Sequence, residues 1–220
     1  MNLNKLKKEE ILWLHNHKCK HSHTLLQHPK CIPKDSPLYE HTGFLDIETT
    51  GLKGDYAFVL SYFIRDDDNK WFGRVLTSDE IWDGVFDKNL LRECVEDMRK
   101  FDKLVVYYGG DFRFDIPLLR TRCIKYGIDF PPYKEIKVVD LYPIVKKKLN
   151  LHNRKLGTVC SFFGIKSKQH MMNPDVWMGA ISGNKKDLEH VRKHNVEDVI
   201  STQKLYYKLI DFVGACNQSI

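Results

Sequence analysis

The chain contains the stretch FLDIETTG at residues 44–51. Apolar and acidic residues alternate here, and successive side chains of a β-strand point to opposite faces of a sheet. A strand would therefore place Asp46 and Glu48 on one face. Leu45 and Ile47 would point into the opposite layer. Two carboxylates so close together repel each other and are costly to bury. A divalent cation bound by both would offset the repulsion and the cost of burial. The alternative is a solvent-facing edge, against which the apolar flanks argue.

The composition of the chain is that of an ordinary globular protein. Its 220 residues suit one domain with a small appendage, and 42% hydrophobic with 29% charged residues exclude a disordered or low-complexity chain. No apolar run reaches the roughly eighteen residues of a transmembrane helix, so no membrane partner is expected. The first residues show no apolar signal segment, and the cysteines do not suggest a disulfide framework. We therefore expect a reducing, cytoplasmic location.

The net charge of 35 − 29 = +6 is unevenly distributed. Residues 1–34 hold seven lysines against two glutamates, and residues 137–170 hold seven lysines and one arginine against one aspartate. Basic blocks beside a net acidic remainder indicate a polyanion partner whose chemistry depends on carboxylates. The alternative is a lysine-rich surface exposed to solvent, and charge alone does not distinguish the two.

Hydrophobic periodicity predicts an α/β domain with a mixed five-stranded sheet flanked by helices. The predicted strands are residues 43–47, 58–65, 71–76, 103–108 and 137–140. The predicted helices are residues 90–100, 116–126, 141–149, 155–163 and 187–212. Residues 1–40 differ from the rest because they hold five of the ten histidines. We expect them to form a small Cys/His-rich appendage to a domain of residues 41–220.

Two further acids are associated with predicted helices, one at a helix start and one on the apolar stripe of a helix. Asp115 precedes Pro117 in the first turn of a helix, where a carboxylate also serves as a cap or a favourable charge. Asp198 lies on the apolar stripe of the last helix, with His194 one turn earlier, and a buried Asp–His hydrogen bond is the alternative there. The stripe consists of Val191, Thr202, Leu205 and Leu209. With the acids of residues 44–51, these carboxylates can hold two Mg²⁺ or Mn²⁺ ions about 4 Å apart and clamp a phosphodiester.

Three segments resemble the exonuclease motifs of the DEDD superfamily of 3′–5′ exonucleases. They are FLDIETTGL at residues 44–52, FDIPLL at 114–119 and HNVEDV at 194–199. The similarity spans residues 43–212. Residues 107–123 and 138–165 look most like stand-alone nucleases related to the proofreading domains of family-B DNA polymerases. The resemblance implies an RNase H-like fold and a two-metal-ion 3′–5′ exonuclease that acts on single-stranded nucleic-acid ends.

The resemblance also implies roles for individual residues. The metal ligands would be Asp46, Glu48, Asp115 and Asp198, and His194 would be the general base. The sequence departs from the family pattern at two points. His194 stands four residues before Asp198, with three residues between them, which is the spacing that the family uses for tyrosine. Gly109-Gly110 stands in place of an Asn-Gly turn. The first departure bears on the placement of the base, and the second on how the backbone grips the substrate.

Basic and aromatic residues near these motifs indicate a substrate channel. Lysine and arginine can follow a phosphate backbone, and aromatic rings can stack on the bases of a single strand. Tyr107 and Tyr108 are candidates for stacking as well. The alternatives are a solvated helix for the lysines and core packing for the aromatics, which is the favoured interpretation for Phe114. The predicted substrate contacts are Thr49, Phe112, Lys146, Lys147, Arg154 and Lys155.

The N-terminal segment has a composition suited to tetrahedral zinc. Cys19 and Cys31, together with two of the three histidines His21, His23 and His28, would make a Cys₂His₂ site. We expect the ligands Cys19, His21, His28 and Cys31. A segment with little apolar content gains order from a structural metal. The alternative is a flexible basic arm that contacts nucleic acid.

Two other functions stay open at this point. An endonuclease on the same fold would cut within a strand, whereas an exonuclease needs a channel that admits only an end. A nucleic-acid binding module without activity is the other alternative, although carboxylates that repel phosphate argue against it. The sequence does not distinguish DNA from RNA as the substrate.

Overall fold

The computed structural model of the chain describes residues 6–28, 31–34, 36, 38–166 and 170–213. The chain forms two compact units, Met1–His41 (unit 1) and Thr42–Ile220 (unit 2). Within the described ranges, no helix is both long and apolar enough to cross a membrane.

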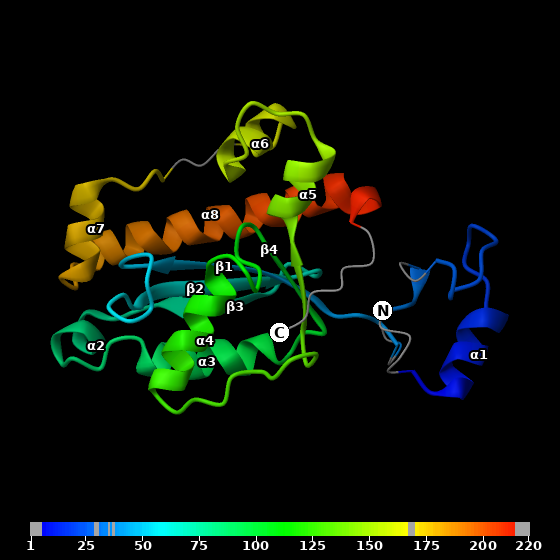
Figure 1. The fold of residues 1–220 in the computed structure, drawn as a ribbon, viewed down its shortest axis with the longest axis horizontal. Coiled ribbons are helices and arrows are strands. Elements are labelled where there is room, and N and C mark those ends of the chain that lie inside the picture. The colour runs from blue at the N-terminus through cyan, green and yellow to red at the C-terminus, as the bar shows by residue number, and fades with distance from the viewer. Residues whose placement is uncertain (1–5, 29–30, 35, 37, 167–169, 214–220) are drawn as a thin grey trace. The chain divides into compact units, whose positions relative to one another are not determined.

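A mixed five-stranded sheet lies at the centre of unit 2 (Figure 1). Its strands are β1 (Thr42–Thr49), β2 (Val59–Asp66), β3 (Trp71–Val75), β4 (Lys103–Val106) and β5 (Lys137–Asp140). They lie side by side in the order β3-β2-β1-β4-β5. The pairs β1–β2 and β2–β3 are antiparallel, whereas β1–β4 and β4–β5 are parallel. The predicted α/β fold with a mixed five-stranded sheet is confirmed.

Helices cover both faces of this sheet (Figure 1). One face carries α5 (Leu141–Lys148), α6 (Leu156–Phe162) and the long α8 (Lys185–Leu209), which continues into a 3-10 turn (Ile210–Phe212). The opposite face carries α3 (Lys88–Met98) and α4 (Asp115–Lys125). The remaining helices of unit 2 are α2 (Ser78–Trp82) and α7 (Pro174–Ile181), and α7 packs against α8.

The alternation of side chains in β1 sorts its residues between two apolar clusters. Leu45 and Ile47 are buried in a cluster that includes α3 and α4 residues, whereas Phe44 is buried with residues of α5 and α8. Because successive side chains of a strand alternate, Asp46 and Glu48 share the face of Phe44. The helix α8 therefore lies over the face that carries the two acids.

The observed helices and strands differ from the predicted ones in number and in where some of them end. The prediction missed α1 (Lys8–Asn16), α2 and α7. The signals for two of them are short-range, since Thr77 caps α2 in a capping box and Asn173 caps α7 ahead of a proline. The strand β4 ends two residues earlier than predicted, at Val106, and Tyr108 takes a positive φ of 63° where the chain turns toward α4.

Unit 1 has a small core of its own. The helix α1 contributes Leu14, which is buried with Leu25 and Ile32. Beyond the helix, an isolated antiparallel bridge joins Lys18 to Thr24. Local turns connect these few elements, so unit 1 contains little regular structure and few buried apolar residues among those described.

Candidate active site

The first two acids of the candidate site come from the end of β1. Asp46 lies opposite Phe63 of β2 in the strand register and Glu48 lies opposite Ser61, and an irregularity after Glu48 ends the regular pairing. The side chain of Asn195 on α8 donates a hydrogen bond of 3.1 Å to the Ser61 hydroxyl. This contact holds α8 against the sheet beside Glu48.

A carboxylate–histidine cluster forms where α8 meets β1. His194 Nε2 lies 3.4 Å from Glu48 Oε1 and 3.9 Å from Asp198 Oδ2. These three residues each offer one ligand atom, and the atoms lie within 4.8 Å of one another. His194 and Asp198 are both buried. The spacing of four residues on α8 thus turns both side chains toward the end of β1.

The tautomer of His194 is set by a neighbouring backbone group. Its Nδ1 lies in hydrogen-bond contact with the carbonyl oxygen of His170, and a carbonyl oxygen only accepts, so Nδ1 carries the proton. Nε2 is then the nitrogen that faces Glu48 and Asp198. A neutral ring in this tautomer can bind a cation or take a proton through Nε2.

Asp115 occupies the first position of α4 and is buried, at 5% exposure. Burial raises the pKa of its carboxyl well above the usual range, and the negative charges of Asp140, Glu48 and Asp198 raise it further. Its Oδ2 atom is buried and has no hydrogen-bond partner in the described part of the chain. A bound cation would offset the repulsion between this buried carboxylate and its acidic neighbours.

The turn before α4 leaves space for the Asp115 side chain because it contains two glycines. A Cβ atom on Gly109 would lie 2.1 Å from Asp115 Oδ2, and one on Gly110 would lie 2.9 Å from Asp140 Cβ. The Ile116 amide also donates to the Gly109 carbonyl, at 3.0 Å. Glycine is therefore required here by close approach, because any side chain would displace the two carboxylates.

Asp140 belongs to this site and was not among the predicted site residues. It ends β5 and caps α5, accepting a hydrogen bond of 2.9 Å from the Tyr142 amide. It also accepts hydrogen bonds from the amides of Tyr108 at 2.9 Å and Gly110 at 3.2 Å. Burial raises the pKa of its carboxyl, although these amides and Arg113 act in the opposite direction. The sequence signal that could have identified Asp140 is its position between a predicted strand and a predicted helix, where an aspartate can cap the helix.

The predicted metal ligands are thus not equally close to one another. Glu48 and Asp198 meet at His194, and the charge of Asp115 acts on both of them. Asp46 lies two residues from Glu48 on the same face of β1, outside the group of atoms within 4.8 Å. His190 contacts the Met171 carbonyl through Nε2, at 3.0 Å, and is also outside this group.

Two of the predicted substrate residues, Arg154 and Lys155, line an open cavity of about 680 Å³. The lining consists of Tyr107, Tyr108, Tyr142, His152, Asn153, Arg154, Lys155 and Leu156. The Tyr107 hydroxyl donates to the Arg154 carbonyl, which joins the loop after α5 to the end of β4. The Tyr108 amide donates to Asp140, so one residue of this basic and aromatic lining contacts an acid of the site.

The other predicted substrate residues lie outside that cavity lining. Phe112 is 84% exposed, and Lys146 and Lys147 are exposed on the last turn of α5. Thr49 is buried, and its hydroxyl donates to the Gly51 carbonyl at 2.7 Å. Phe114 packs against the core, in agreement with the favoured interpretation.

Comparison with known proteins agrees with this architecture. Residues 43–210 match the family model of the RNase_H superfamily. The match covers well over half of the chain, so the protein belongs to the RNase_H superfamily, and the predicted RNase H-like fold is confirmed. Nucleases of this superfamily act on nucleic acid and generally use divalent metal ions, so the membership supports nuclease activity in general.

Two DNA polymerases are similar to parts of the chain. The family B DNA polymerase from the hyperthermophilic archaeon Pyrobaculum calidifontis superposes with a TM-score of 0.64 and 19% sequence identity, over 78% of this chain and 24% of the polymerase. A DNA polymerase of Methanocaldococcus jannaschii is 29% identical over 113 residues, which cover 41% of this chain and 7% of the polymerase. The chain therefore spans a small part of either polymerase, and the likeness to the family B DNA polymerase, at 19% identity, shows a similar fold.

Proposed function

We propose that the protein is a two-metal-ion 3′–5′ exonuclease that hydrolyses phosphodiester bonds at single-stranded nucleic-acid ends. The observation that carries this proposal is the meeting of Glu48, His194 and Asp198 beside the buried Asp115. These residues come from β1, α4 and α8, the elements that hold the three resembling motifs. Carboxylates concentrated in this way have no role in a module that only binds phosphate.

The acids suit a pair of Mg²⁺ or Mn²⁺ ions. Hard divalent cations prefer carboxylate oxygens, and the four ligands would be Asp46, Glu48, Asp115 and Asp198. The buried Oδ2 of Asp115 and the raised pKa of that carboxyl fit this assignment. When bound, such ions activate water and stabilise the charge on the leaving oxygen.

The contacts of His194 support a role in proton transfer. With Nδ1–H directed at the His170 carbonyl, His194 Nε2 is the atom that takes the proton of the attacking water and releases it to solvent. Asp198 and Glu48 stabilise the imidazolium that forms, since they lie 3.9 Å and 3.4 Å from Nε2. The backbone contact thus orients the ring for general-base catalysis.

The substrate would approach along the basic and aromatic cavity. Arg154 and Lys155 supply positive charge for phosphates, and Tyr107 and Tyr108 supply rings for stacking. Lys146 and Lys147 extend the positive charge along α5, and Phe112 presents an exposed ring. Stacking requires bases that are not paired, which favours a single strand. Thr49, which follows the two acids of β1, would also contact the substrate.

A labelled oligonucleotide tests the proposal. A 5′-labelled single-stranded DNA and its RNA counterpart are incubated with Mn²⁺ and either the wild-type chain or Asp46→Ala. The wild type should give a descending ladder that starts at the full-length strand, and Asp46→Ala should give none. Asp175→Ala, which removes an exposed acid on α7, is the matched control and should behave as the wild type.

Circular single-stranded substrate separates the alternatives. An exonuclease leaves a circle intact, whereas an endonuclease opens it and produces internal fragments of the linear strand. Binding without any product, at about pH 6 to 9 with either metal ion, would replace the proposal with a binding module. Cleavage that persists in Asp46→Ala would overturn the assignment of the site.

A further inference from the structure

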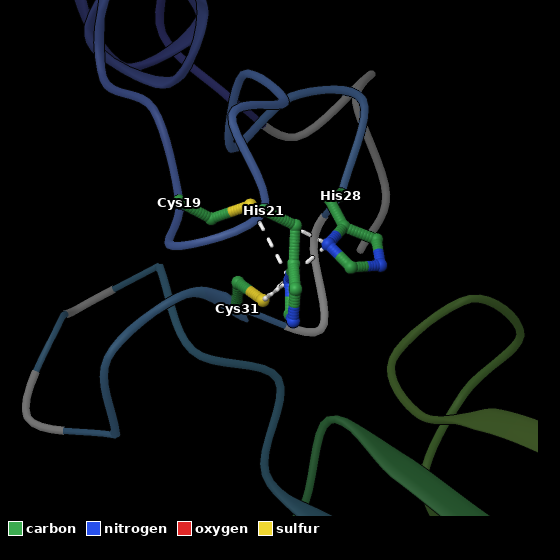
Figure 2. A group of neighbouring side chains, drawn as sticks. All are labelled: Cys19, His21, His28 and Cys31. Atoms are coloured by element: carbon green, nitrogen blue, oxygen red, sulfur yellow. Dashed lines mark hydrogen bonds between the residues drawn. The ribbon is translucent and has the colours of Figure 1, made fainter.

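A second group of metal-binding side chains lies in unit 1. The side chains of Cys19, His21, His28 and Cys31 point toward one another from two separate turns (Figure 2). Both cysteines are free thiols. The four ligand atoms lie within 4.8 Å of one another. This group contains sulfur and nitrogen only, unlike the carboxylate cluster of unit 2.

Four sulfur–nitrogen distances describe the shape of the group. Cys19 Sγ lies 3.7 Å from His21 Nδ1 and 3.5 Å from His28 Nδ1. Cys31 Sγ lies 3.4 Å from each of the same two atoms. A tetrahedral Zn²⁺ with Zn–S of about 2.3 Å and Zn–N of about 2.0–2.1 Å requires S···N edges of about 3.6 Å. The four measured distances agree with this value to within about 0.2 Å.

Hydrogen bonds alone do not account for the four contacts. An imidazole Nδ1 has either one proton or one lone pair, so each of the two rings makes one full hydrogen bond through that atom. At most about two of the four sulfur–nitrogen contacts can then be hydrogen bonds at one time. One cation at the centre of the group would satisfy both thiolates and both rings together.

The backbone holds the ligands in two turns. The Cys19 amide donates to the His23 carbonyl at 2.8 Å, which places Cys19 and His21 in one tight hairpin. The Cys31 amide donates to the His28 carbonyl at 3.0 Å, so these two side chains leave one turn on the same side. His23 makes a ring contact with His28, with centroids 5.4 Å apart, but does not belong to the four-residue group.

Unit 1 needs stabilisation beyond its apolar core. It spans Met1–His41, and among its described residues the core cluster contains three that are buried, Leu14, Leu25 and Ile32. Chains of about 40 residues rarely bury enough surface to fold alone and are usually held by a metal, by disulfides or by association. A metal that binds both turns of the folded unit, and not the unfolded chain, adds its binding free energy to the stability of the folded state.

We infer that Cys19, His21, His28 and Cys31 form a structural zinc site. Zn²⁺ binds the two sulfur atoms as thiolates and the two neutral rings through Nδ1, and each thiol releases its proton to solvent. The donors fill a tetrahedron, which makes the site structural, since a catalytic zinc keeps an open position. The inference does not depend on nuclease activity, because it uses different residues and a different class of ligand atom.

Metal content is the first test. The full chain is purified with reductant and dialysed against metal-free buffer, and its zinc is measured by mass spectrometry. The wild type should retain about one zinc ion per chain, and Cys31→Ser should lose most of it. His23→Asn is the matched control and should retain zinc as the wild type does. Loss of zinc in His23→Asn, with retention in His28→Asn, would overturn this ligand set.

A cobalt spectrum keeps the test informative if Cys31→Ser fails to fold. Co²⁺ added to the metal-free wild type should give the visible bands of a tetrahedral site and a near-ultraviolet thiolate-to-cobalt band, and both should disappear when Zn²⁺ is added. Carboxylates do not produce the thiolate band, so Asp198→Asn should show it unchanged. Reduced wild-type protein that binds no zinc and shows no thiolate band would overturn the inference.

Discussion

At the scale of single residues, the orientation of His194 determines what its ring can do. The His170 carbonyl accepts from Nδ1, so Nε2 faces the acids that would hold the metal ions. The ring is buried, at 8% exposure, and cannot swing into solvent without leaving this contact. This geometry supports the proposal that His194 accepts the proton of water.

Replacing this base should slow the reaction without abolishing binding. We expect His194→Gln to lower kcat by about 10²–10⁴ and to leave KM within about threefold. His190→Gln is the control, because His190 contacts the Met171 carbonyl and lies outside the cluster. Steady-state rates on a labelled single strand measure both variants. Equal losses in the two variants would show that the histidines act through folding rather than through proton transfer.

Asp115 should destabilise the metal-free protein at neutral pH. Burial and the charges of Asp140, Glu48 and Asp198 raise the pKa of its carboxyl, so the folded state binds this proton more tightly than the unfolded state. Stability from this group is therefore present at low pH and is lost as the pH rises through the raised pKa. In the presence of a chelator, Asp115→Asn should have a higher melting temperature than the wild type.

The pH dependence of this difference provides the control. The gap between Asp115→Asn and the wild type should shrink as the pH falls from neutral toward the usual carboxyl range, where the wild-type carboxyl is protonated in both states. Differential scanning calorimetry across that range measures it. A gap that stays constant with pH would mean that the substitution changes packing and not charge.

At the scale of elements, the turn between β4 and α4 couples the sheet to the site. Its two glycines pack directly against the carboxylates of Asp115 and Asp140, and Asp140 in turn accepts from the backbone of the turn. The strand ends at Val106 and the helix begins at Asp115, so the intervening residues set where this acid lies. The position of Asp115, a proposed metal ligand, thus depends on the absence of side chains at Gly109 and Gly110.

A single methyl group in this turn should disable the site. The added Cβ of Gly109→Ala would lie 2.1 Å from Asp115 Oδ2, so the carboxylate must move. We expect cleavage to fall by about 10²-fold, because a displacement of about 1 Å has effects of that size. Gly157→Ala is the matched control, since a Cβ there meets nothing within 4 Å. Full activity in Gly109→Ala would show that Asp115 does not need its present position.

At the scale of the whole molecule, one buried ion pair joins the sheet to two helices. Asp87, which precedes α3, accepts hydrogen bonds from Arg122 of α4 at 2.6 Å and 2.9 Å and from the Val59 amide of β2 at 2.9 Å. Asp87 is 0% exposed and Arg122 is 2% exposed. The pair fixes α4, and with it Asp115, against the sheet.

Removing one partner of this pair should be strongly destabilising. We expect Arg122→Met to lower the free energy of unfolding by about 3–5 kcal/mol, because it leaves the Asp87 charge buried and uncompensated. Arg99→Met is the control, since Arg99 pairs with Asp129 and Glu135 at the surface and should change stability by about 1 kcal/mol or less. Urea unfolding curves measure both. Similar midpoints for the two variants would contradict the structural role of the buried pair.

Patterns of short range predicted much of the fold. Alternation in residues 44–51 placed Leu45 and Ile47 in the layer opposite Asp46 and Glu48, and the structure buries both in the cluster that includes α3 and α4 residues. The helical period placed Asp198 on a buried stripe with Thr202. The prediction missed α1, α2 and α7. The helix α2 spans five residues, and the apolar residues of α1 and α7 form contiguous runs (residues 11–14 and 176–178), so no helical period emerges in these segments.

The sequence by itself determined which side chains share a face, because a strand repeats every two residues and a helix every 3.6 or so. That is why Asp46 and Glu48 point the same way, and why His194 and Asp198 lie one turn apart. The tertiary structure decided which faces meet. The contact of Glu48 with His194, the support of the glycine turn by Asp140, and the choice of His21 and His28 beside the two cysteines all join separate segments. Backbone periodicity does not extend across a loop, so the packing of the cores and the paths of the turns set these contacts.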